Sequence, residues 1–363
     1  MVQVLIGILN LTVVAALVGC VVGWIFGFLR LRNGEPLLQP ESRVRPLVGF
    51  AEVIMAVGLY FVLMVAGMNV AAPLGWIETR GPGSNEPIAL DPDFAARVTI
   101  DGISKVAAVA LLLIWLSFLD QHALRRLGMI PRFRDLKIGL ITAAMLIPPV
   151  LILQQLLNLL TPYEHPVKDL IEARPTLLIG LLLAANTVLI APFAEEFFFR
   201  GLLQGWFQRL SRRGIVRSLA TERGETAVER NDAVVDRDEA EFHPEQRPAE
   251  EASRNPYQAF DPRAAEPPEA APSVRTEWIA ADEVQHWPWW PMLLTSLLFG
   301  LIHWGQGAAP VSLFFLAMGL SYVTRQTGSL WPAITVHFAL NACATAAMFL
   351  STGVPTDPPP LGP

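Results

Sequence analysis

The chain has 363 residues, of which 52% are hydrophobic and only 17% are charged, with a formal net charge of −6. Soluble domains contain roughly 25% charged residues, so this composition argues against a soluble globular enzyme and indicates a membrane protein with several spans. The charge is divided unevenly. Residues 218–286 hold 17 acidic and 7 basic side chains, whereas the remainder holds 16 acidic and 20 basic ones. Because no long basic patch is present, nucleic acid is not expected as a partner.

A transmembrane helix needs about 20 apolar residues, and eight segments follow this pattern. They lie near 3–29, 47–76, 102–119, 138–160, 177–208, 288–303, 309–326 and 329–350. The first segment lacks a basic start and is longer than the apolar core of a signal peptide, which is about 7–15 residues. We therefore expect it to be a retained span. The predicted fold is all-α: a polytopic bundle of about eight transmembrane helices.

Basic side chains follow the odd-numbered spans, and few follow the even-numbered ones. Cytoplasmic loops carry the excess of Lys and Arg in membrane proteins. The pattern therefore predicts an even number of spans with both termini outside, in the inner or plasma membrane of the cell. The basic residues that carry this prediction are Arg30, Arg32, Arg43, Arg45, Arg125, Arg126, Arg132, Arg134, Lys137, Arg209, Arg212, Arg213, Arg217 and Arg325.

Residues 211–287 interrupt the hydrophobic pattern with a sequence rich in Pro, Glu, Ala, Arg and Asp. Such a composition buries too little apolar surface to offset the entropy of ordering the chain. We expect a mostly disordered acidic insertion in the cytoplasm, with a short helix near 276–284; a folded accessory domain is the alternative. A basic cytoplasmic protein is a possible partner for residues 218–286.

Ionisable side chains inside a bilayer are costly and commonly functional. Three predicted spans concentrate them: span five reads AEEFFFR from 194, span six reads FGLIH from 299, and span eight reads HFALN from 337. Glu196 and Arg200 stand at i and i+4 with the acid first, the favoured order for an ion pair. Glu195 points about 100° away around the helix, so its carboxylate stays available.

The two remaining motifs bring histidines from other helices. His337 and Asn341 are also at i and i+4, so their side chains leave one helix face together, and His303 comes alone from span six. Each element has a structural interpretation by itself, such as an ion pair or a hydrogen bond between helices. Their similar depth in three spans favours one shared site instead.

These motifs resemble those of the CPBP intramembrane proteases, which include the type II CAAX prenyl endopeptidases and bacterial Abi proteins. The matching patterns are EExxxR (Glu195, Glu196, Arg200), FxxxH (Phe299, His303) and HxxxN (His337, Asn341), in the family's order. The resemblance covers about 177–345 without the insertion, and it adds nothing for spans one to four. The predicted domains are 1–160 with spans one to four, 161–350 with a CPBP-like catalytic membrane core divided by 211–287, and a Pro-rich tail at 351–363.

The resemblance implies hydrolysis of peptide bonds within the membrane. It makes Glu195 the general base that polarises water, assisted by His303, and it makes His337 and Asn341 the groups that stabilise the oxyanion. Arg200 would hold Glu196 and order the helix, and Phe299 belongs to the supporting residues.

A divalent metal is the open alternative to this glutamate mechanism. Glu195, His303 and His337 form a valid ligand set for Zn²⁺, which would activate the water. The family is often described as metalloproteases, and a metal-free mechanism is also entertained for it. The sequence does not choose between the two.

Two functions from other classes compete with the endopeptidase. Intramembrane carboxylates and histidines also relay protons, as in a proton-coupled transporter, and a non-catalytic membrane scaffold or immunity-type protein would keep the site as a structural network. For the enzyme, a site among lipid-exposed helices favours a hydrophobic, membrane-associated or lipidated peptide as substrate, with membrane lipid around it.

Overall fold

The computed structural model describes residues 2–44, 48–77, 93–161, 177–211 and 278–352. Helices make up most of these residues, which confirms the predicted all-α class. The described strands are β1 (Arg43–Val44) and β2 (Trp278–Ile279), which form one short antiparallel pair. Residues 212–277 lie outside the described residues. The predicted disorder of the insertion, its basic partner and the flexible tail therefore stay predictions.

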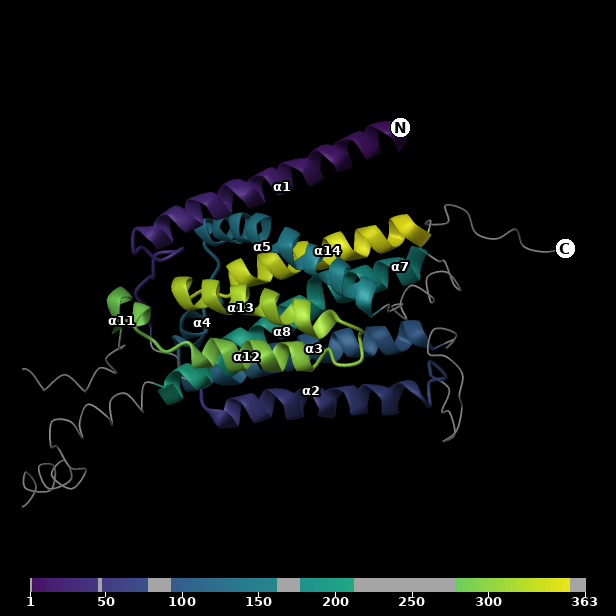
Figure 1. Cartoon of the computed structure of the whole chain (residues 1–363). Helices are drawn as coiled ribbons and strands as arrows, with labels where there is room; N and C mark the ends of the chain where they lie inside the picture. The colour runs from purple at the N-terminus through teal and green to yellow at the C-terminus, as the bar shows by residue number, and fades with distance from the viewer. Residues whose placement is uncertain (1, 45–47, 78–92, 162–176, 212–277, 353–363) are drawn as a thin grey trace, which may run out of the picture. The chain divides into compact units, whose positions relative to one another are not determined.

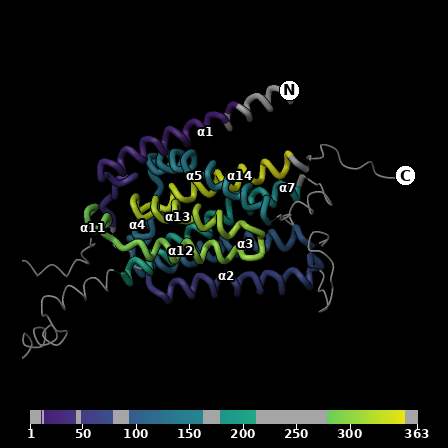
Figure 2. The backbone as a smooth tube through the Cα atoms, in the orientation of Figure 1, coloured from purple at the N-terminus to yellow at the C-terminus, as the bar shows by residue number. Residues whose placement is uncertain are grey.

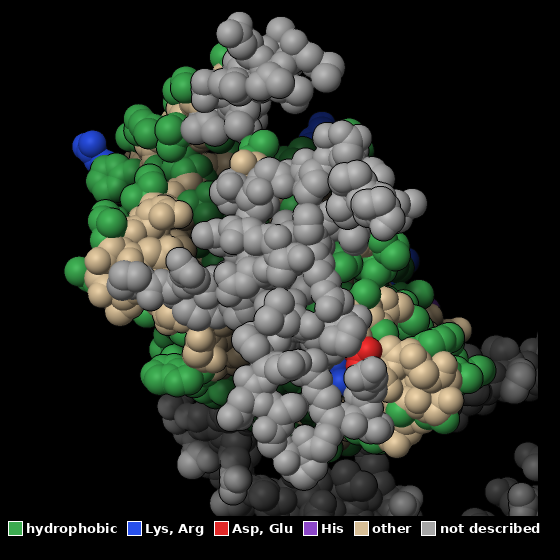
Figure 3. Space-filling model, turned by 90° about the vertical axis from the view of Figure 1, so that its right-hand side faces the viewer, with side chains coloured by type: hydrophobic (Ala, Val, Ile, Leu, Met, Phe, Trp, Pro, Cys, Tyr) green, Lys and Arg blue, Asp and Glu red, His purple; other side chains and the backbone are tan. Residues whose placement is uncertain are grey.

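Six helices among the described residues are long and apolar enough to cross a membrane. Only 6% of the apolar window of the second helix is buried inside the protein, and large side chains such as Phe118 are 85% exposed. Figure 3 shows one end of the molecule, where hydrophobic groups predominate among the visible described side chains. Such surfaces require lipid as the solvent, so the chain is an integral membrane protein. The six are α1 (Val2–Arg32), α2 (Phe50–Ala71), α3 (Phe94–Leu119), α5 (Phe133–Leu160), the composite helix Leu178–Ser211 and α14 (Trp331–Thr352).

The sixth and seventh predicted spans correspond to helices outside this set of six. α12 (Trp290–Leu301) has 12 residues and is about 18 Å long, which is short of the roughly 30 Å hydrocarbon core. α13 (Ala309–Thr327) ends in a polar stretch that the protein buries. The two pack along each other as a hairpin (Figure 2), and Arg325 near the end of α13 donates to the carbonyl of Trp287 just before α12 at 2.6 Å. Because the hairpin begins and ends on the same side of the bundle, the number of membrane crossings stays even, as the sequence predicts.

The segments that follow spans one, three, five and seven meet at the same end of the bundle. Glu41 accepts hydrogen bonds or ion pairs from Arg132 at 3.2 Å and Arg134 at 3.0 Å, and its backbone N–H donates to the carbonyl of Gln326 at 2.8 Å. This grouping is the one that the alternation of basic loops predicts. A short helix, α4 (Ala123–Arg126), lies in the same region of the chain.

The centre of the bundle is formed by the composite helix together with α12, α13 and α14, which lie between α1 and α2 (Figure 1). One buried cluster joins Phe197, Phe199 and Leu202 to Phe299 and Leu330. A second cluster packs α5 against α13 and α14. The helices on either side of residues 212–277 thus pack into one core.

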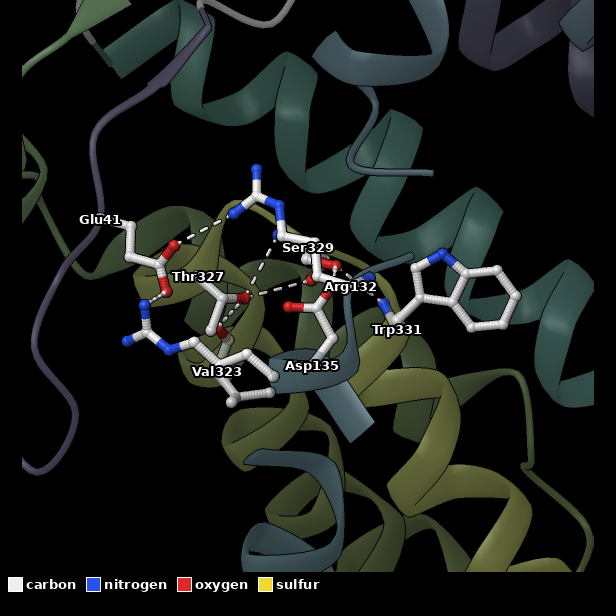
Figure 4. Close-up of polar contacts among 8 residues, drawn as sticks. Glu41, Arg132, Asp135, Val323, Thr327, Ser329 and Trp331 are labelled. Carbon is white, nitrogen blue, oxygen red and sulfur yellow. Dashed lines mark hydrogen bonds and ion pairs between the residues drawn. The ribbon is translucent and has the colours of Figure 1, made fainter. Parts of the chain in front are cut away.

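The turn between α13 and α14 is fixed to the start of α5 (Figure 4). Ser329 donates its hydroxyl hydrogen to Asp135 at 2.8 Å, and Thr327 donates to the carbonyl of Val323. Gly128 approaches this turn so closely that a Cβ there would meet the carbonyl oxygen of Gly328 at 2.5 Å. These contacts set the position of α14, the helix that carries His337 and Asn341.

Residues 278–287 fold onto the bundle as β2 and α11 (Ala281–Gln285), where the sequence predicts a short helix near 276–284. Arg43 of β1 joins both chain ends that flank residues 212–277. Its guanidinium donates to Gln208 at 2.6 Å and lies 4.4 Å from the ring centroid of Trp287. The stretch therefore leaves and re-enters the bundle next to one side chain.

Candidate active site

The composite helix changes its winding around the two glutamates. α7 (Leu177–Ala184) leads into the π-helical segment η2 (Ala185–Ile190), then α8 (Ala191–Glu196), then a second π-helical segment, η3 (Phe197–Leu203). Pro192 at the start of α8 has no N–H to give to the preceding turn, which accounts for irregular winding there. Short π-helical segments are frequent at functional sites.

Glu196 is fully buried and bridges two partners. Its Oε2 lies 3.1 Å from Nε of Arg200, and its Oε1 lies 2.8 Å from Nδ1 of His337. The guanidinium of Arg200 lies 4.6 Å from the ring centroid of Phe299, a favourable place for a cation. The predicted ion pair between Glu196 and Arg200 is therefore present, and His337 is a second partner that the sequence did not indicate.

The hydrogen bond from His337 fixes its tautomer. A carboxylate paired with a guanidinium accepts, so Nδ1 of His337 carries the hydrogen and Nε2 keeps its lone pair when the ring is neutral. That Nε2 lies 3.8 Å from Oε2 of Glu195. The edge of the ring also packs against Phe299. His337 thus stands between the two adjacent carboxylates.

Glu195 faces a cavity instead of the protein core. Its side chain is 25% exposed and makes no hydrogen bond to another described residue. It lines a cavity of about 340 Å³ whose wall is mostly apolar. Of the two adjacent glutamates, one is held by partners and the other is accessible, which is the division that the helical spacing predicts.

His303 lies just beyond the end of α12 and is partly buried. Its Nδ1 donates to the carbonyl of Phe299 at 2.8 Å, and the two rings lie 5.1 Å apart. Phe299 therefore contacts both imidazoles. As in His337, the bond at Nδ1 leaves Nε2 free to accept.

Asn341 points toward a different partner from the one that the sequence suggests. Its amide donates to the backbone carbonyl of Thr187 in η2 at 2.8 Å, which ties α14 to the composite helix. The structure thus brings Glu195, Glu196, Arg200, His337 and Phe299 together, and the ring of His303 packs on Phe299. Among the described residues, no hydrogen bond or ion pair joins Asn341 to these side chains.

The predicted zinc ligands do not converge. Within the described ranges, no group of three His, Cys, Asp or Glu side chains is placed to hold a metal ion. Bonds from Nδ1 that leave Nε2 free are typical of metal-binding histidines, so the tautomers suit a metal. The positions of Glu195, His303 and His337 do not.

Sequence reasoning missed a polar group on the second and third spans. Asp101 and Lys105 form an i, i+4 ion pair at 2.6 Å, and Tyr60 on α2 donates to Asp101 at 2.7 Å. The prediction began the third span at 102, whereas α3 begins at Phe94. The pair lies within this helix, and its i, i+4 spacing was the signal that could have revealed it.

The fold and this site define an integral membrane protein with a buried glutamate–histidine–arginine network beside an open glutamate. A family model described as "Type II CAAX prenyl endopeptidase Rce1-like" matches residues 176–221 and 276–343, which contain all three motifs. This part of the chain is similar to that family, which agrees with the resemblance inferred from the motifs. Comparisons with curated proteins and with solved structures gave no match.

Proposed function

We propose that this protein is an intramembrane endopeptidase that hydrolyses peptide bonds of hydrophobic, membrane-associated or lipidated substrates. The position of Glu195 carries the proposal: its carboxylate lines an apolar cavity, with Nε2 of His337 3.8 Å away. A water molecule beside Glu195 has a base within hydrogen-bonding reach. The family match over this region supports the same activity.

In the proposed reaction, Glu195 takes one proton from water while the water oxygen bonds to the carbonyl carbon of the substrate. The C–N bond of the tetrahedral intermediate then breaks, and the proton held by Glu195 passes to the leaving amine. The products are a carboxylic acid and an amine, so no other reagent is consumed. The apolar surroundings strengthen the electrostatic interactions of the reacting groups.

The other side chains take supporting roles in this proposal. His303 holds the water through its free Nε2. His337 and Asn341 donate to the oxyanion, and a donor of this kind lowers the barrier by about 3 kcal/mol. His337 can do so only when Nε2 also carries a proton, because its Nδ1 hydrogen goes to Glu196; Asn341 has a second amide hydrogen besides the one given to Thr187. Glu196, Arg200 and Phe299 position these groups.

The orientation in the membrane is part of the same proposal. The basic segments gather at one end of the bundle, and positive charge marks the cytoplasmic side. We place residues 211–287 on that side, in the inner or plasma membrane of the cell. An acidic segment there has the charge to bind a basic cytoplasmic protein.

The decisive variant is Glu195→Gln, which keeps the shape of the side chain and removes the base. The matched control is Glu35→Gln, an exposed glutamate near the end of α1. We expect the first to lower hydrolysis of an apolar fluorogenic peptide by at least about 100-fold, and the control to retain activity. Membranes that contain the wild type should also show peptide termini absent with Glu195→Gln. Equal hydrolysis by both variants would exclude the assignment.

A further inference from the structure

The cavity beside Glu195 has a second polar group in its wall, Tyr60 with Lys105; this group and Glu195 are its two poles. Residues of α2, α3, α8 and η3 form most of its wall, and nearly all of them are apolar. Besides Glu195, the polar side chains at the wall are Tyr60 and Lys105. Both belong to the first four spans, outside the residues that match the family model. The proposed reaction gives neither of them a role.

Lys105 is held in place by a carboxylate that is already well satisfied. Asp101 accepts from Lys105 at 2.6 Å, from Tyr60 at 2.7 Å and from the amide of Asn186 at 3.0 Å. An ammonium group has three N–H donors. Lys105 gives one of them to Asp101, and the other two reach no acceptor among the residues that the structure describes.

The cation faces the cavity, and its counter-ion lies behind it. Lys105 and Tyr60 line the wall, whereas Asp101 does not. A group that enters the cavity therefore meets the ammonium and two free donors. In apolar surroundings such a donor binds strongly to an anionic oxygen, because little water competes for it.

The two poles are separated by the length of a short peptide. Asn186, which binds Asp101, precedes Glu195 by nine residues on the composite helix. At about 1.5 Å per residue, and less in the π-helical η2, Asn186 and the Asp101–Lys105 pair that it contacts lie at most about 13 Å along the helix from Glu195. An extended peptide covers about 3.3 Å per residue, so about four residues fit between the poles.

We infer that Lys105 is a specificity-determining residue, which receives a carboxylate of the substrate about four residues from the bond that Glu195 attacks. The inference rests on the proposed function for the place of the cleaved bond. The carboxylate-binding role of Lys105 rests on the lining of the cavity alone. The apolar wall holds the side chains between the two ends. The carboxylate is either the C-terminus of the substrate or an Asp or Glu side chain.

Three fluorogenic peptides with one apolar sequence separate these sources. The first has a free carboxylate about four residues beyond the cleaved bond, the second has an amide there, and the third has the amide and a glutamate at the same position. They are offered to the full chain in zwitterionic lipid nanodiscs. The variants are Lys105→Met, Lys105→Arg and, as a control, Lys137→Met, which changes an exposed lysine of α5.

We expect the wild type to cleave one of the carboxylate peptides with a kcat/KM at least about tenfold above that of the amide. Lys105→Met should bring this preference within about twofold by raising KM for that peptide, without changing hydrolysis of the amide. Lys105→Arg and Lys137→Met should keep the preference. The inference is overturned if the wild type shows no preference, or if Lys105→Met slows all peptides equally. It is also overturned if, in nanodiscs with added phosphatidylglycerol, Lys105 promotes binding of this lipid and of no peptide.

Binding to Glu195→Gln protein separates this inference from the proposed function. One outcome keeps the carboxylate site and rejects the peptidase assignment. In it, the wild type cleaves none of the peptides, the Glu195→Gln protein binds a carboxylate peptide about tenfold more tightly than the amide peptide, and adding Lys105→Met removes this difference in binding. Equal binding of all three peptides to Glu195→Gln protein overturns the carboxylate site.

Discussion

Oε1 of Glu196 lies 2.8 Å from Nδ1 of His337, although 141 positions separate the two residues in the chain. The contact joins the composite helix to α14 at a point where both side chains are buried. It also links the first and third motifs directly. The same imidazole also lies beside the accessible carboxylate, with its Nε2 3.8 Å from Oε2 of Glu195.

Removing the charge of Glu196 should destabilise the bundle. Glu196→Gln leaves the guanidinium of Arg200 buried without a counter-ion, and breaking a buried ion pair costs about 3–5 kcal/mol. We expect a loss of this order in the free energy of unfolding, measured by denaturation in detergent. Combining it with Arg200→Met should recover part of the loss. A Glu196→Gln protein as stable as the wild type would contradict the role given to this pair.

Substitutions of the two histidines should differ in their effect on the stability of the protein. His337 is 3% exposed and bonded to Glu196, whereas the ring of the partly buried His303 hydrogen-bonds to the carbonyl of Phe299, four residues earlier in the chain. Both His337→Gln and His303→Gln should lower peptide hydrolysis, by about 100-fold or more for a group that acts on the water. Only His337→Gln should also lower the midpoint of thermal unfolding. Full activity of His303→Gln would remove this residue from the site.

Hydrolysis should survive the removal of divalent metal. Glu195, His303 and His337 do not converge as a ligand set, and a carboxylate can itself act as the base. The measurement is the rate of peptide cleavage by protein dialysed against a chelator, with its metal content determined in parallel. Activity that is lost on chelation and restored by Zn²⁺ would establish the metal mechanism instead.

The turn that positions α14 offers a test with a matched control. Gly128 and Gly34 both have positive φ, at 70° and 76°, but only Gly128 lies against other atoms. Gly34→Ala should cost about 1 kcal/mol for the strained backbone. Gly128→Ala should cost at least about 2 kcal/mol more, because its Cβ meets backbone at 2.5 Å, a case of overpacking. The comparison is of unfolding free energies, and equal losses would contradict the close approach.

The sequence predicted the parts of the fold that depend on local composition. Long apolar runs identified the six spans, and the order of Glu196 and Arg200 along one helix gave their ion pair. α12 and α13 were expected as spans because an apolar run of this length looks the same in lipid and in a protein interior. Their hairpin is set by packing between helices, which no local pattern records.

The site was predictable in its membership and less so in its contacts. Ionisable residues in an apolar background marked Glu195, His303 and His337. The bond from Asn341 to Thr187 and the bridge between Glu196 and His337 depend on how helices rotate against one another. A spacing within one helix does not determine that rotation. Lys105 lies inside the predicted third span, but its partner Asp101 falls outside because that span starts eight residues too late, so the ion pair was missed.

Arg43 binds Gln208 on one side of residues 212–277 and packs on Trp287 on the other. With both ends of that stretch held at one side chain, closing the loop costs free energy that grows only with the logarithm of its length, about 0.6 kcal/mol for each doubling. The membrane core can therefore accept segments of very different length at this point. Evolution is free to lengthen, shorten or replace the segment there without rebuilding the candidate active site.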